Sequence, residues 1–165
     1  SLANLAGIYV NQGDYVKAEP LYKRSLAIRE KVLGPDHPSV ATSLNNLASL
    51  YKTQGDYSKA ELLFKRSLAI KEKVLGSEHS DVATSLNNLA GLYYSQENYA
   101  KAEPLFKRSL AILEKALGPD HPKVATSLEN LAKFYRMTKR PAESEKLEAR
   151  AKKIRARHDD NDVHR

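Results

Sequence analysis

The sequence predicts an all-α fold, an α-solenoid of antiparallel helix pairs with about four repeats. The stretch Thr42–Gly76 returns as Thr84–Gly118, shifted by 42 residues along the chain. When His37–Gly76 is aligned with His79–Gly118, only about a quarter to a third of the positions differ. A fixed period of this size indicates stacked helical units, each of which buries its apolar face against its neighbours.

Each full unit contains two predicted helices joined by a short turn. In the first unit, the first helix runs to about Asn11, and Gly13 supplies the turn that follows. Asp14 is placed to cap the second helix, which runs from about Tyr15 to Leu33 and stops at Gly34. Apolar residues in this helix recur three and four positions apart, as expected for an amphipathic helix.

The later units repeat this design with small changes. Pro38 fits the first turn of the next helix, because a residue in the first turn has no use for its backbone N–H inside the helix. This helix runs to about Thr53. The third unit has Ser80 in place of that proline and Glu97-Asn98 in place of the Gly-Asp turn. Asn98 can still cap the helix that follows.

The fourth unit keeps VATSLENLAKFY and then departs from the pattern. Three charged residues replace apolar ones at equivalent positions, namely Glu148 for Phe106, Lys152 for Leu110 and Lys153 for Ala111. A terminal unit with a polar outer face is what a repeat array needs to remain soluble. We therefore predict a capping helix over 141–157 and a frayed acidic tail over 158–165.

These elements divide the solenoid, residues 1–157, into repeats at about 1–34, 35–76, 77–118 and 119–157. Ser1 aligns with Ser43, Ser85 and Ser127, which lie inside the first helix of their repeats. We therefore expect the array to begin upstream of this sequence. An open flank on the first repeat also predicts weak head-to-tail self-association.

One histidine recurs in each segment between repeats, at His37, His79 and His121. A metal site needs several ligands to converge on one ion, whereas translation along an array keeps equivalent residues apart. We therefore predict a turn or capping role for these histidines, with no metal site.

The net charge of +7 belongs mainly to one segment of the chain. Residues 1–132 carry 16 Lys or Arg and 14 Asp or Glu, whereas residues 133–157 carry ten basic residues and three glutamates. The basic segment either keeps the last helix solvated or contacts an anionic surface. It lacks interleaved aromatic residues and any nucleic-acid motif, so the first interpretation is favoured.

The persistent positions carry a family resemblance. In the first helix they are Leu2/Leu44/Leu86, Leu5/Leu47/Leu89, Ala6/Ala48/Ala90 and Tyr9/Tyr51/Tyr93, and in the second they are Ala18/Ala60/Ala102, Tyr22/Phe64/Phe106 and Ser25/Ser67/Ser109. Their order resembles the tetratricopeptide repeat (TPR), with Leu where that family often has Trp. The 42-residue spacing, rather than about 34, together with LNNLA and LGPDHPxVA, resembles the kinesin light chain-like subfamily.

This resemblance implies a right-handed superhelix whose first helices line a concave groove that binds a peptide or partner protein. The implied groove residues are Asn4, Asn45, Asn46, Ser49, Lys52, Asn87, Asn88, Gly91, Tyr94, Asn130, Lys133 and Arg136. An Asn side chain can donate to and accept from a peptide backbone at once, which suits sequence-tolerant binding. The same asparagines could instead join neighbouring helices, and the sequence leaves both roles open.

Other classes of function find little support in the sequence. There is no cysteine, no glycine-rich phosphate loop and no nucleophile with a base beside it outside the repeat. No apolar run is long enough to span a bilayer, and no signal-peptide pattern follows Ser1. We expect a cytoplasmic protein that is not an enzyme, needs no cofactor and contacts neither membrane nor nucleic acid.

The function predicted from the sequence is therefore that of a protein-protein interaction scaffold. Two alternatives stay open at this point. The array could be the interaction or sensor arm of a larger enzyme or signalling protein, or it could be a purely structural spacer.

Overall fold

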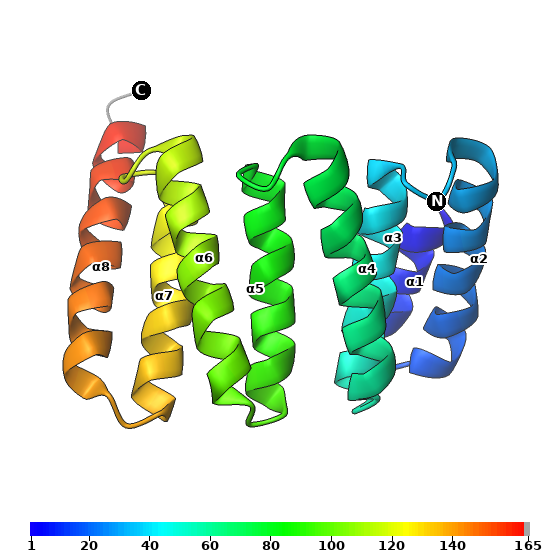
Figure 1. The fold of residues 1–165 in the computed structure, drawn as a ribbon, viewed down its shortest axis with the longest axis horizontal. Coiled ribbons are helices and arrows are strands. Elements are labelled where there is room, and N and C mark those ends of the chain that lie inside the picture. The colour runs from blue at the N-terminus through cyan, green and yellow to red at the C-terminus, as the bar shows by residue number, and fades with distance from the viewer. Residues whose placement is uncertain (164–165) are drawn as a thin grey trace. The chain divides into compact units, whose positions relative to one another are not determined.

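The computed structural model describes residues 1–163, with side chains to residue 159, and these residues form eight α-helices and no strand (Figure 1). The helices are α1 (Leu2–Asn11), α2 (Tyr15–Leu33), α3 (Pro38–Thr53), α4 (Tyr57–Leu75), α5 (Ser80–Ser95), α6 (Tyr99–Leu117), α7 (Pro122–Met137) and α8 (Pro141–Val163). The predicted all-α architecture of helix pairs is confirmed, and none of the described helices is long and apolar enough to cross a bilayer.

The helix ends follow from local capping interactions. The side chains of Asp14, Asp56 and Asn98 accept hydrogen bonds from backbone N–H groups in the first turn of α2, α4 and α6, at 3.2–3.3 Å. The predicted bounds of α2 are confirmed. The last helix differs from the prediction, because α8 continues to Val163 instead of ending at 157. The expected frayed tail is thus helical over 158–163, and its last two residues lie outside the described residues.

The recurring histidines cap the first helices, as predicted. The Nδ1 atoms of His37, His79 and His121 each accept a hydrogen bond at 3.1 Å from the backbone N–H two residues further on. Within the part of the chain that the structure describes, no group of three or more His, Asp or Glu side chains could hold a metal ion.

The turns inside the repeats require a left-handed backbone. Gly13 and Gly55 have φ of 75° and 80°, a region that glycine adopts without steric cost. The equivalent residues in the later repeats are Glu97 and Lys139, with φ of 57° and 61°. The Glu97-Asn98 pair therefore makes the same turn as Gly-Asp, at a conformational cost of roughly 1–2 kcal/mol for a non-glycine residue.

The two helices of a pair approach closely through a serine. The buried hydroxyl of Ser67 in α4 donates to the Ala41 carbonyl oxygen in α3 at 2.8 Å. Ser109 in α6 makes the same bond to Ala83 in α5, also at 2.8 Å. A hydroxyl on one helix can reach a carbonyl of the next helix only where small side chains separate the two backbones.

The chain divides into two compact units, each larger than a single repeat, Ser1–Ser77 and the residues from Glu78 onward. From here on, "unit" means one of these two parts, and "repeat" means one helix pair. In the first unit, α1 packs on α2, α3 packs on α4, and α2 packs on α3. In the second unit, α5 packs on α6, α7 packs on α8, and α6 packs on α7. Each unit thus contains two helix pairs stacked by one contact between a second helix and the following first helix.

A buried hydroxyl in α7 lacks the partner that its counterpart has in α3. Ser43 accepts a hydrogen bond from the Arg29 guanidinium at 2.9 Å. At the equivalent position the hydroxyl of Ser127 is buried with no hydrogen-bond partner, and the residue equivalent to Arg29 is Leu113. An unsatisfied buried hydroxyl costs stability, because it loses its bonds to water on folding.

We expect opposite effects from two serine substitutions in the second unit. Ser109→Ala should lower the free energy of unfolding by about 0.5–1.5 kcal/mol, because a made hydrogen bond is lost. Ser127→Ala should leave it unchanged or raise it by up to about 1 kcal/mol, because an unpaired hydroxyl is replaced by a better helix former. Urea unfolding of the two variants tests this, and a destabilised Ser127→Ala would show that the Ser127 hydroxyl has a hydrogen-bond partner after all.

Removal of residues 126–165 should destabilise what remains of the second unit. The side chains of Phe106, Ile112 and Leu113 in α6 are buried, and α6 packs against α7. Without α7 and α8, part of this apolar surface faces water. We expect a lower melting temperature and poorer solubility for the chain ending at 125. A melting curve unchanged from that of the full chain would overturn the capping role of the last repeat.

Candidate functional site

A stripe of small and polar side chains runs along each first helix. In α3 the exposed or half-buried residues Thr42, Asn46, Ser49 and Thr53 recur at helical spacing, while most of the other positions are buried. The equivalent stripe is Thr84, Asn88, Gly91 and Ser95 in α5, and Thr126, Asn130, Lys133 and Met137 in α7. Amides, hydroxyls and small residues dominate this stripe, so it can present donors and acceptors while allowing another backbone to approach closely.

Seven of the predicted groove residues lie on these stripes. They are Asn4 in α1, Asn46 and Ser49 in α3, Asn88 and Gly91 in α5, and Asn130 and Lys133 in α7. All of them are exposed or half-buried.

The asparagines one position earlier differ from their neighbours. Asn45 is 9% exposed, and its amide oxygen is buried without a hydrogen-bond partner. The amide oxygen of Asn87 is likewise buried and unpaired. One residue turns a side chain by about 100° around a helix, so these two positions leave the stripe. The sequence prediction did not separate Asn45 from Asn46 or Asn87 from Asn88.

The remaining three predicted groove residues occupy equivalent positions in three repeats, but their surroundings differ. Lys52 and Tyr94 are half-buried, whereas Arg136 is exposed and forms an ion pair with Glu148 of α8. This position therefore does not present a row of cations.

Tyr94 belongs to an aromatic cluster in the second unit. Its ring centroid lies 5.9 Å from that of Tyr99 and 6.2 Å from that of Phe134. Phe134 is 2% exposed and also contacts the Phe106 ring at 5.7 Å, whereas Tyr99 remains 38% exposed. The sequence predicted Tyr94 as a groove residue and gave no prediction of an aromatic cluster. In α3 the position of Tyr94 holds Lys52, and the position of Phe134 holds Leu50. These two replacements by aromatic residues were the sequence signal that could have predicted the cluster.

A carboxylate-to-tyrosine hydrogen bond joins successive helix pairs within each unit. The Tyr51 hydroxyl in α3 donates to Glu19 in α2 at 3.0 Å, and the Tyr135 hydroxyl in α7 donates to Glu103 in α6 at 3.2 Å. A cation also lies over each ring, with the Lys59 ammonium 5.1 Å from the Tyr51 ring centroid. Burial raises the pKa of both tyrosine hydroxyls, so they remain protonated donors at neutral pH.

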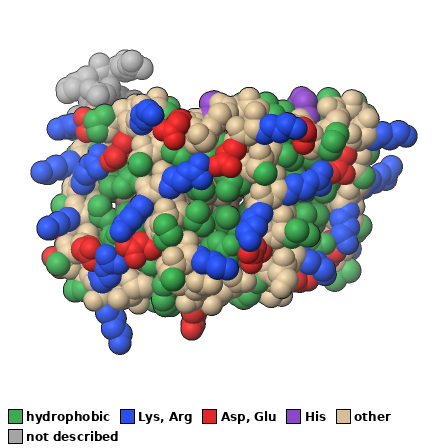
Figure 2. Space-filling model, viewed as in Figure 1, with side chains coloured by type: hydrophobic (Ala, Val, Ile, Leu, Met, Phe, Trp, Pro, Cys, Tyr) green, Lys and Arg blue, Asp and Glu red, His purple; other side chains and the backbone are tan. Residues whose placement is uncertain are grey.

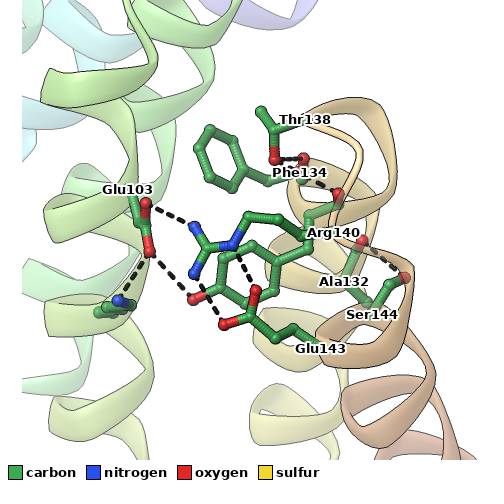
Figure 3. Close-up of polar contacts among 9 residues, drawn as sticks. Glu103, Ala132, Phe134, Thr138, Arg140, Glu143 and Ser144 are labelled. Carbon is green, nitrogen blue, oxygen red and sulfur yellow. Dashed lines mark hydrogen bonds and ion pairs between the residues drawn. The ribbon is translucent and has the colours of Figure 1, made fainter.

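In the last repeat the cation over the tyrosine ring is an arginine instead of a lysine. Arg140 occupies the position of the helix-capping Asp56, and its guanidinium carbon lies 4.2 Å from the Tyr135 ring centroid. Figure 3 shows this guanidinium between the carboxylates of Glu103 and Glu143. The bond to Glu103 measures 2.9 Å and crosses from α7–α8 to α6. Arg140 thus ties the last helix pair to the preceding one.

The arginines of the basic segment are engaged within the second unit. Each of the five forms an ion pair, Arg136 with Glu148, Arg140 with Glu103 and Glu143, Arg150 with Glu114, Arg155 with Glu129, and Arg157 with Asp120. On the face shown in Figure 2, basic and acidic side chains are interspersed. Three of these arginines lie in α8, where they join that helix to α6, to α7 and to the segment between them.

The fold agrees with comparisons to known proteins. The tetratricopeptide repeat family matches residues 1–73 and 74–157. The chain belongs to this family. Its repeats are kinesin light chain-like, and tetratricopeptide repeats generally mediate contacts between proteins. No curated protein sequence matches the chain significantly.

Solved structures with similar repeats cover nearly the whole chain. BtubC (BKLC) from P. vanneervenii is 29% identical with a TM-score of 0.84, over 96% of this chain and 63% of that one. A putative kinesin light chain of Podosopora anserina with nearly identical TPR-like repeats is 30% identical with a TM-score of 0.77, over 95% of this chain and 74% of that one. MamA, at 16% identity and a TM-score of 0.64 over 96% of this chain and 79% of that one, shares the fold. This TPR chain thus spans less than two thirds of the length of BtubC.

The Glu103 network makes stability depend on pH in a defined direction. The Lys107 ammonium, and with it the Arg140 guanidinium, holds the pKa of the Glu103 carboxyl below its ordinary value, against the opposing effect of burial. A lowered pKa in the folded state means that this stabilisation is present above the unfolded-state pKa. It is lost as the pH falls through the folded-state value.

We expect Glu103→Gln to lower the free energy of unfolding at pH 7 by about 1–2 kcal/mol, because the amide forms no charge-assisted bonds. The difference in the free energy of unfolding between variant and wild type should shrink as the pH falls below the ordinary pKa of a glutamate. Urea unfolding at pH 7 and pH 3 measures this. An equal difference at both values would show that the carboxylate charge is not the cause.

Proposed function

We propose that this TPR chain is a scaffold that binds an extended or partly helical peptide of a partner protein along the stripes of its first helices. The observation that carries the proposal is the split between adjacent asparagines. Asn46 and Asn88 are half-buried on the stripe, whereas Asn45 and Asn87 bury their amide oxygens. Repeat packing therefore accounts for one asparagine of each pair and leaves the other at the surface.

The chemistry of the stripe suits recognition of a peptide backbone. Each Asn amide can donate one hydrogen bond and accept another, which matches the alternating groups of a main chain. The small residues Ser49 and Gly91 lie one turn further along the same stripes and leave room for a backbone to approach. The stripes of α3 and α5 carry no charge, so they favour sequence-tolerant binding.

Binding of a peptide's terminal carboxylate is not supported. Such recognition needs fixed cations beside the asparagines. The position that supplies Lys52 in α3 holds an aromatic residue, Tyr94, in α5, and in α7 it holds Arg136, which pairs with Glu148. Internal segments of a partner are therefore the better ligands. We place this interaction in the cytoplasm, since a chain without cysteine suits a reducing compartment.

The adjacent asparagine pairs supply a matched test. The double variant Asn46→Ala, Asn88→Ala should weaken binding of peptides selected from a random library against the wild type by about 1–3 kcal/mol. Its melting temperature should not fall, because alanine favours an exposed helix position. Isothermal titration and thermal unfolding of the same preparation give both quantities.

The control is Asn45→Ala, Asn87→Ala, which removes two amides whose oxygens are buried. Because their oxygens are unpaired, this variant should leave the free energy of unfolding unchanged or raise it, as expected for Ser127→Ala, with a peptide affinity within about twofold of the wild type. The proposal fails if the stripe variant binds peptide as well as the wild type, or if it loses stability while the control does not.

A further inference from the structure

The turn between α5 and α6 differs from its counterpart between α3 and α4 at two positions. Tyr94, a half-buried residue near the end of α5, stands in the place of Lys52. Glu97, which is exposed in the turn, stands in the place of Gly55. The third repeat therefore has an aromatic ring instead of a cation and a carboxylate instead of a neutral residue. Both changes make this turn more favourable for a positively charged ligand.

Glu97 has a backbone conformation that favours glycine. Its φ is 57°, in the left-handed region that glycine adopts without steric cost. Its backbone N–H donates to the Tyr94 carbonyl oxygen at 3.0 Å, whereas its carboxylate has no hydrogen bond or ion pair with any residue that the structure describes. Internal packing therefore does not explain a glutamate at this position. Backbone outliers of this kind cluster at functional sites, which makes the Glu97 carboxylate a candidate ligand-binding group.

Two tyrosine rings lie on either side of Glu97 in the chain. The ring centroids of Tyr94 and Tyr99 are 5.9 Å apart, and the ring planes are tilted by 46°. The buried ring of Phe134 contacts both of them edge to face, at 6.2 Å from Tyr94 and 5.9 Å from Tyr99. Phe134 thus fixes two rings that remain accessible from their other sides, since Tyr94 is half-buried and Tyr99 is exposed.

Elsewhere in this chain, a tyrosine ring with a carboxylate nearby holds a cation. The Arg140 guanidinium carbon lies 4.2 Å from the Tyr135 ring centroid, and the same guanidinium donates to the Glu103 carboxylate at 2.9 Å. Three lysines lie over other tyrosine rings, at 5.0–5.4 Å from the centroids. Within the described part of the chain, no Lys or Arg lies over the rings of Tyr94 and Tyr99.

We propose that Tyr94, Glu97 and Tyr99 form a binding site for one basic side chain of the partner peptide, and that arginine fits it best. The planar guanidinium stacks on a tyrosine ring and donates to the Glu97 carboxylate, as Arg140 does with Tyr135 and Glu103. The inference rests on the proposed function, because it assigns a side chain to the peptide on the stripes. Tyr94 follows Gly91 by three residues and therefore borders the α5 stripe.

The cations of α7 and its turn limit the ligand to a single basic residue. Arg136 is paired with Glu148, and Arg140 is held by two carboxylates, so neither is available to fill the site. Lys133 is exposed on the α7 stripe and disfavours a run of basic residues in the peptide. We therefore expect one arginine at a fixed position among otherwise neutral or acidic residues.

A small arginine derivative tests the site without a peptide. N-acetyl-L-arginine amide, added to the intact chain with ¹³C-labelled tyrosine rings, should shift the NMR signals of Tyr94 and Tyr99 in a saturable manner. The citrulline analogue has nearly the same shape without the charge, and it should bind at least about fivefold more weakly. Glu97→Gly, which introduces the glycine of the first two repeats, should weaken binding at least about threefold without lowering the melting temperature. Absence of a saturable shift, or equal binding of the citrulline analogue, would overturn the site.

A selected peptide separates this site from the proposed function. In a peptide selected from a random library against the wild type, replacement of the arginine by citrulline should raise Kd about tenfold for the wild type. The change should stay within about twofold for the variant Tyr94→Lys, Glu97→Gly, which carries the residues of the second repeat. The stripe variant Asn46→Ala, Asn88→Ala should weaken both peptides and keep the tenfold ratio between them.

The possible failures differ in these titrations. Selected peptides that lack a recurring arginine, yet bind the stripe variant more weakly than the wild type, would overturn the basic side-chain site and support the proposed function. Peptides that lose affinity on citrulline replacement but bind the stripe variant as well as the wild type would support the site and overturn the stripes. If the library yields no binder, the proposed function fails, and the NMR titration alone decides the site.

Discussion

The close approach of the two helices in each pair is the constraint on which the repeat depends. Ser67 and Ser109 donate to carbonyl oxygens of the partner helix at 2.8 Å, so the backbones there have room only for small side chains. Fully buried alanines occupy the neighbouring repeated positions, such as Ala48 and Ala60. A larger residue at these positions would push the helices apart and disturb every contact that the pair makes with its neighbours.

Stacking of one helix pair on the next depends on a different interaction, in which a glutamate accepts a hydrogen bond from a tyrosine and a cation lies over the tyrosine ring. In the first unit it consists of Glu19, Tyr51 and Lys59, and in the second of Glu103, Tyr135 and Arg140. The cation comes from different positions, yet it lies over the tyrosine ring in both cases. The glutamate and tyrosine are therefore fixed by stacking, whereas the cation comes either from the first turn of the following helix, as Lys59, or from the position just before that helix, as Arg140.

A few surface residues differ between the repeats of this array. The stripes of α3 and α5 are neutral, whereas that of α7 contains Lys133, and only the second unit has the Tyr94 aromatic cluster. The arginines of α8 form ion pairs within their unit. Under the proposed function, ligand choice depends on these few surface differences, because the asparagines of the stripe recur in every repeat.

The sequence by itself determined the helix pairs, their caps and their turns. Those features depend on residues a few positions apart, such as Asp14 at a helix start or His37 before Pro38, and the fixed period repeats them. Tertiary structure decided which of two adjacent asparagines faces solvent, and it brought Arg140 between Glu103 and Glu143. The same holds for α8, whose arginines contact acidic residues as far away as Glu114 and which continues beyond its predicted end. Side-chain orientation on a helix covered from several directions, and ion pairs between distant segments, depend on how the helices pack, which local sequence patterns do not specify.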